Sequence, residues 1–216
     1  MPEPPGPEID RLLYLGLGWV LGMASSLIVD AVRRKRQLDE IRAGLKTELS
    51  SLRYRLAHIA FDFARRTDKW NRELLTSILP ALELESEVAL PSRMGEGVRG
   101  FLSLSDEHLA EGAQRLAPEP EASVSPRTYQ MPYLDANVNA LARLGEDSRR
   151  RLLEIRAQLE GLNQTMAEIR ELNAATFLDL NAENRRHVDA NLDASYGNVL
   201  ERCLIIEQLG VETDLS

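Results

Sequence analysis

Residues 12–29 read LLYLGLGWVLGMASSLIV, eighteen consecutive residues without a charge. At about 1.5 Å of rise per residue, a helix of this length just spans a hydrocarbon core about 30 Å thick. A cluster of four consecutive cations follows after a short gap: Arg33, Arg34, Lys35 and Arg36. The pattern predicts a single transmembrane helix over residues 11–32 with a basic cluster at one end.

Two other interpretations compete with a membrane span, a signal peptide and a buried core helix. A signal peptide carries its positive charge ahead of the apolar run. Residues 1–10 instead read MPEPPGPEID, and Arg11 is the one cation before the run. A buried core helix is not normally followed by four cations in a row. Both alternatives therefore fit the charge order less well than a span does.

The basic cluster also predicts the orientation of the span, because Lys and Arg beside a membrane helix are retained on the cytoplasmic side. Residues 1–10 would form a short extracytoplasmic tail, and everything after residue 32 would be cytoplasmic. This makes the chain a single-pass protein of the cell (inner, cytoplasmic) membrane, a layout typical of bacteria. The cluster Arg33–Arg36 is interpreted as a topology signal in preference to a specific contact with anionic lipid head groups.

Small residues recur at every fourth position within the apolar run: Gly18, Gly22 and Ser26. In lipid, such a face lets two helices approach each other closely. It can mediate packing between transmembrane helices of two copies, or it can reflect simple tolerance of small residues. Both interpretations stay open.

Apolar residues continue beyond the cluster at alternating spacings of three and four: Leu38, Ile41, Leu45, Leu49, Leu52, Leu56, Ile59 and Phe63. This is a helical stripe of coiled-coil type. No proline interrupts the chain between Pro7 and Pro80, so we expect one rod from the membrane to about Arg66. A short helix with Asp68 as its N-cap follows, and Pro80 or the Pro91 region ends or redirects it.

The remaining chain divides by composition. Residues 33–116 form the stalk helix and shorter helices, one of them opened by Ser105 as N-cap. Residues 117–132 are rich in proline and predict a linker or loop. Residues 133–216 predict a long helical hairpin that packs on the stalk, with one helix from about Tyr133 to Ala175 and a last helix ending at Gly210.

These amphipathic helices must bury their apolar stripes, which predicts an all-α fold. The preferred arrangement is an antiparallel helical bundle with a coiled-coil-like first helix that continues from the membrane span. The alternative is a parallel oligomer in which the stripes are buried between copies. Periodicity does not distinguish the two.

The chain lacks compact catalytic and cofactor motifs. It has no H-E-x-x-H, no phosphate-binding G-x-x-x-x-G-K-[ST], no G-x-S-x-G and no C-x-x-C. The single cysteine, Cys203, falls on an apolar stripe and is interpreted as a core residue. The net charge of −8 argues against nucleic-acid binding. We therefore predict no catalytic, cofactor or metal residue and no small-molecule substrate; the alternative is an enzyme with a dispersed site.

Together these features predict a membrane-anchored, non-enzymatic cytoplasmic helical module for interaction or scaffolding. Its partners would be the lipid bilayer and either another protein or a second copy of the chain. The alternative is a signalling or effector protein that transmits a conformational change between the helical bundle and the membrane helix.

Overall fold

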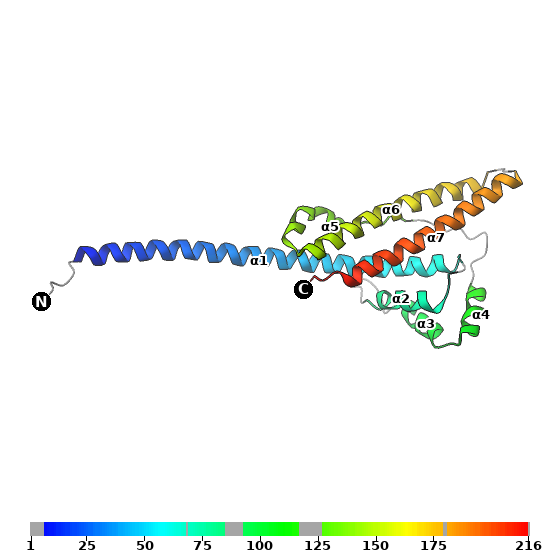
Figure 1. Ribbon diagram of the computed structural model, residues 1–216, viewed down its shortest axis with the longest axis horizontal. Helices are drawn as coiled ribbons and strands as arrows, with labels where there is room; N and C mark the ends of the chain where they lie inside the picture. The colour runs from blue at the N-terminus through cyan, green and yellow to red at the C-terminus, as the bar shows by residue number, and fades with distance from the viewer. Residues whose placement is uncertain (1–6, 68, 85–92, 117–126, 179–180, 216) are drawn as a thin grey trace. The chain divides into compact units, whose positions relative to one another are not determined.

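The computed structural model describes residues 7–67, 69–84, 93–116, 127–178 and 181–215. Within these ranges the regular elements are all helices and none is a strand, which confirms the all-helical prediction. The elements, shown in Figure 1, are α1 (Pro7–Ala64), α2 (Arg72–Leu82), α3 (Arg93–Leu102), α4 (Asp106–Leu116), α5 (Pro132–Ala136), the 3-10 helix η1 (Val138–Arg143), α6 (Glu146–Thr176) and α7 (Ala182–Glu212). They belong to two compact units, Met1–Ala43 and Gly44–Ser216.

The first unit consists of the N-terminal part of α1. In the described part of the chain, α1 is the one helix long and apolar enough to cross a membrane, by length and composition. Its apolar side chains are uncovered: Leu15 is 72% exposed, Trp19 67% and Leu27 66%.

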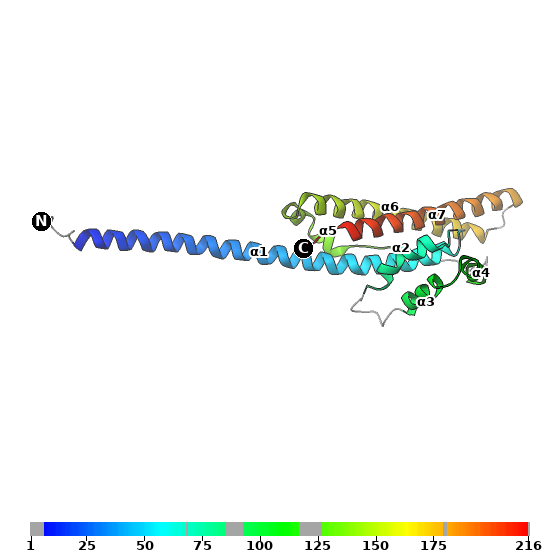
Figure 2. The same ribbon diagram turned by 60° about the horizontal axis from the view of Figure 1, so that its bottom comes forward.

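The core of the second unit is built from three helices: the part of α1 from Gly44 onward, α6 and α7. Helices α6 and α7 form an antiparallel hairpin, seen in both Figure 1 and Figure 2. Arg202 of α7, for example, donates to Gln158 of α6 at 3.0 Å. Helix α1 packs against the same hairpin, where Phe63 meets Tyr196 edge to face at 5.2 Å between ring centroids.

The apolar stripes point into this core as their spacing predicts. On each of the three helices the residues at alternating spacings of three and four are buried: Leu45, Leu49, Leu52, Leu56, Ile59 and Phe63; Leu152, Ile155, Leu159, Leu162, Met166 and Ile169; and Leu192, Tyr196, Val199, Cys203 and Ile206. Each helix thus buries one apolar face in the core.

The single helix predicted from Tyr133 to Ala175 is wrong, because the structure divides this segment into α5, η1 and α6. The side-chain amide of Asn137 donates to the Tyr133 carbonyl at 2.8 Å, a local bond that competes with helix continuation. Leu144 is extended, and Gly145 occupies the N-cap position of α6. Acidic residues in the next turn favour a new helix N-terminus there.

A carboxylate of α1 holds α5 in place. Glu48 accepts hydrogen bonds from the backbone nitrogens of Tyr133 at 2.7 Å and Leu134 at 2.8 Å, at the start of α5. The Tyr133 ring lies directly on Gly44, where a Cβ atom would overlap it. A glycine is therefore required for this close approach.

Other predicted helix boundaries have mixed outcomes. Pro80 lies inside α2, which ends at Leu82, so the helix does not end at this proline; Pro91, the alternative, lies outside the described residues. Pro80 is exposed, so the backbone carbonyl that lacks a donor from its nitrogen can face water. Helix α7 continues past Gly210 to Glu212. Ser105 is confirmed as the cap of α4, since its hydroxyl accepts from the His108 nitrogen at 3.3 Å. Asp68 and most of the linker, residues 117–126, lie outside the described residues.

Candidate functional site

A groove of about 680 Å³ lies between α2 and the C-terminal half of α7, within the second unit. Its lining is mostly apolar, with five aliphatic side chains: Leu74 of α2, and Leu200, Leu204, Ile205 and Val211 of α7. Leu74 and Leu200 are buried, whereas Val211 is 62% exposed. The groove therefore has a closed apolar floor and is open to solvent toward the end of α7.

The rim of the groove is acidic. Glu73 of α2 and Glu201 and Glu212 of α7 are exposed along it, and Lys69 is the one cation among the lining residues. Glu212 is in an ion pair with Arg151 at 3.6 Å. Glu73 and Glu201 have no ion-pair partner among the residues that the structure describes, so their charges face solvent.

A nearly buried ion pair fixes α7 to α1, and its carboxylate residue, Glu207, is part of the groove lining. Arg53 donates through Nε to Glu207 Oε2 at 3.0 Å and through Nη2 to Oε1 at 2.6 Å. The two side chains are only 14% and 9% exposed. Planar bidentate pairing of this kind adds geometric definition as well as energy. The stem of Arg53 crosses Gly210, where a Cβ would lie 2.7 Å from its Cδ atom.

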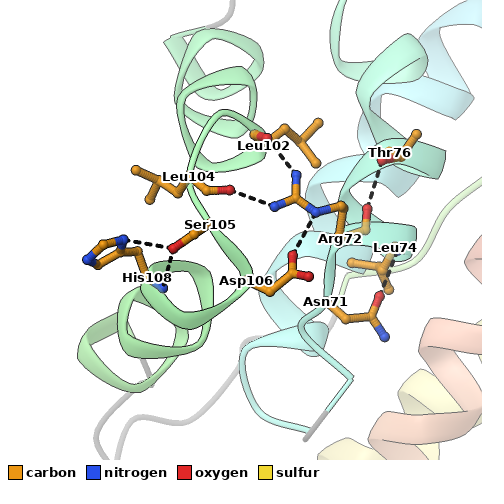
Figure 3. A network of polar contacts seen from close by, with 9 residues as sticks. All are labelled: Asn71, Arg72, Leu74, Thr76, Leu102, Leu104, Ser105, Asp106 and His108. Carbon is orange, nitrogen blue, oxygen red and sulfur yellow. Dashed lines mark hydrogen bonds and ion pairs between the residues drawn. The ribbon is translucent and has the colours of Figure 1, made fainter.

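The opposite wall, α2, is held from its far side by Arg72. Its guanidinium donates to the Leu102 and Leu104 carbonyls at 2.6 Å each, and to Asp106 Oδ1 at 2.8 Å. Figure 3 shows this side chain reaching from the start of α2 to the end of α3 and the start of α4. Beside it, Ser105 Oγ lies 2.8 Å from His108 Nδ1. The network ties three short helices together.

An aromatic cluster positions the entry to α2. Trp70 lies edge-on to Phe61 of α1, at 4.7 Å between ring centroids, and to Phe101 of α3, at 5.6 Å. Asn71 then caps α2 by accepting from the Leu74 nitrogen at 2.9 Å. Both walls of the groove are thus anchored, α7 through the lining residue Glu207 and α2 through Trp70 and Arg72, so the groove is a preformed surface.

The residues predicted from sequence to contact the membrane all lie on α1, in the first unit. The basic cluster Arg33–Arg36 is exposed, as are Gly18 and Gly22. A Cβ added at either glycine would meet no atom within 4 Å. The Ser26 hydroxyl donates to the Met23 carbonyl of its own helix at 2.9 Å. The groove and this small-residue face belong to different units.

Cys203 and His58 carry potentially reactive groups, and burial shifts the pKa of both. Cys203 is 2% exposed on the buried face of α7, as its spacing predicts, and burial raises the pKa of its thiol. Burial also lowers the pKa of His58, more than the nearby Asp62 carboxylate raises it. No three side chains of His, Cys, Asp or Glu gather as metal ligands in the part of the chain that the structure describes.

No protein-family model, curated protein or solved structure matches this chain. The groove was not found from the sequence, although α7 carries a signal for it. The run from Cys203 to Ile206 places apolar residues on more than one side of the helix. A helix with a second apolar face has something further to cover than its own core.

Proposed function

We propose that this chain is a membrane-anchored interaction module. Residues 11–32 would hold it in the cell membrane with the N-terminus outside. The second unit would then bind a protein partner at the cytoplasmic surface. The observation that carries the proposal is the groove between α2 and α7, an open apolar surface with two fixed walls.

The anchor is supported by the exposed apolar surface of α1 and by its position next to the basic cluster. In a bilayer the same side chains would be covered by lipid, and every backbone polar group of the span would be satisfied within the helix. The cations Arg33–Arg36 would lie at the cytoplasmic interface, where anionic lipids attract them.

Binding, in preference to catalysis, is supported by the composition of the groove. Ser77 is the one hydroxyl among the lining residues, and it donates to the Leu74 carbonyl at 2.8 Å. No histidine or cysteine lines the groove to activate a nucleophile. A preformed apolar floor with polar edges matches the anatomy of protein–protein contact sites, and its fixed walls reduce the ordering cost of binding.

Site-specific photocrosslinking of the full chain in native membranes tests the proposal. A photoreactive amino acid replaces Val211 in the groove or, as the matched control, Leu153 of α6, which is 41% exposed outside it. The proposal predicts a discrete protein adduct from position 211 and none from position 153. Adducts of equal yield from both positions, or none from either, would contradict it.

A second candidate function is transmission of a conformational change between the membrane helix and the bundle. The observation that favours it is that α1 is one uninterrupted helix from Pro7 to Ala64. Hydrogen exchange of residues 33–38 in lipid tests it: slow exchange is expected for a continuous helix, and rapid exchange would remove the link.

A further inference from the structure

We infer that the partner presents a cationic amphipathic helix, which lays its apolar side chains into the groove between α2 and α7 and directs Lys or Arg toward Glu73 and Glu201. This inference rests on the proposed function, because it names the partner's chemistry at the same groove.

The shape of the groove favours a helix. Its α7 wall runs from Leu200 to Glu212, which corresponds to about 18 Å, or somewhat more than three helical turns. Helices that bind in grooves present apolar side chains at i, i+3, i+4 and i+7, which span about 10 Å and so fit within this length. Among the described residues there is no strand edge to pair with an extended peptide.

The negative charge of the rim favours a positively charged partner. Glu73 and Glu201 face the groove from its two walls without an ion-pair partner among the described residues, and Lys69 alone opposes them. An acidic helix, a nucleic acid or an anionic lipid head group would meet like charge there. A basic helix instead gains attraction from both sides while its apolar face is buried.

The test uses the full chain in nanodiscs of phosphatidylcholine, a neutral lipid that does not attract a basic peptide. The probe is a fluorescent amphipathic helical peptide with leucines on one face and lysines flanking them, titrated by anisotropy. Two matched peptides serve as controls: one with glutamate in place of lysine, and one of the same composition without helical periodicity. We expect the lysine peptide to bind at least about tenfold more tightly than either control peptide.

Two charge-reversal variants separate the groove from general acidity. Glu73→Lys with Glu201→Lys reverses the rim, whereas Glu160→Lys with Glu168→Lys changes the same number of exposed carboxylates on α6. Neither pair removes a buried contact, so both variants should fold. The inference predicts at least about a tenfold loss of peptide affinity for the rim variant and little change for the α6 variant.

Three results would overturn the inference. Equal losses in the two variants would mean that the peptide responds to net charge and not to the groove. Equal affinity for the lysine and glutamate peptides would refute the cationic partner. A dimer in sedimentation that dissociates in the rim variant would assign the groove to a second copy of the chain.

A failure of this inference can be distinguished from a failure of the proposed function. If position 211 crosslinks to a protein while the lysine peptide shows no preference, the interaction module stands and only its partner chemistry is wrong. If position 211 yields no adduct, the interaction module itself is refuted.

Discussion

Breaking the nearly buried ion pair between Arg53 and Glu207 should destabilise the protein far more than breaking an exposed ion pair does. The variant Glu207→Ala removes the carboxylate but leaves the guanidinium, which is only 14% exposed, without its counter-charge. An uncompensated buried charge of this kind costs about 3–5 kcal/mol, whereas the pair itself adds little over an apolar replacement. Against a typical domain stability of about 5–15 kcal/mol, that loss is large.

Two comparisons isolate the cause. Replacing both partners, as Arg53→Met with Glu207→Leu, removes both charges, so this variant should be more stable than Glu207→Ala. The variant Asp135→Ala breaks an exposed pair with Arg156, joined at 2.7 Å with side chains 52% and 49% exposed. Solvent screens that pair, and its loss should cost less than about 1 kcal/mol.

Urea denaturation of the full chain in detergent micelles measures these differences through the fluorescence of Trp70, which lies in the aromatic cluster at the start of α2. A Trp19→Phe background removes the other tryptophan. If Glu207→Ala and Asp135→Ala cost the same, or if the double replacement is the least stable variant, the reasoning from burial is refuted.

Three other changes follow from the same contacts. Burial lowers the pKa of His58 from its ordinary value of 6.5, so as the pH falls the imidazole is protonated at a higher pH in the unfolded chain than in the folded one. The free energy of unfolding should therefore fall as pH drops below about 6.5 and level off below the folded pKa. Urea titrations over this range should show a flatter slope for His58→Gln, and an unchanged slope would contradict the assignment. Cys203, buried and with a raised pKa, should resist maleimide until the protein is unfolded in urea, and rapid labelling of the folded protein would refute its core position. Gly44→Ala forces its Cβ into the Tyr133 ring and should cost about 1–3 kcal/mol, whereas Gly97→Ala in open space on α3 should be neutral or stabilising by up to about 1 kcal/mol; equal urea midpoints for the two variants would contradict this.

The helices and their buried faces could be predicted because both depend on local periodicity. Leu152 and Ile169, at opposite ends of the α6 stripe, are each fully buried, and spacing alone places them on one face. Cys203 was assigned to the core on the same argument. Ser105 was recognised as a cap because the capping bond reaches only three residues along the chain.

The contacts that build the groove could not be predicted in this way. Arg53 and Glu207 are separated by 154 positions, and no local pattern indicates that two charged residues so far apart will meet. The same holds for the bond from the Tyr133 nitrogen to Glu48, over 85 positions. The first contact depends on how α7 packs against α1, and the second on how α5 packs against it.

The roles of Pro80 and Gly161 could not be predicted from local sequence, because they depend on exposure to water and on a neighbouring side chain. Pro80, with the Pro91 region as the alternative, was expected to end or redirect a helix, but near the exposed end of α2 water can take over the lost backbone bond. The role of Gly161, which lies inside α6, depends on a neighbouring side chain. The structure places the Arg202 guanidinium where its Cβ would lie, so the glycine makes room for a contact between α6 and α7.

The anchoring part of the proposed function depends on one claim, that residues 12–29 cross a membrane. Alkaline carbonate extraction of membranes that contain the full chain tests it, with a matched variant that carries Val20→Arg and Leu21→Arg. Each arginine costs about 2.5–3.5 kcal/mol at the centre of a span. We predict that the natural chain stays in the membrane pellet while the variant is released; release of the natural chain into the supernatant would contradict the anchor.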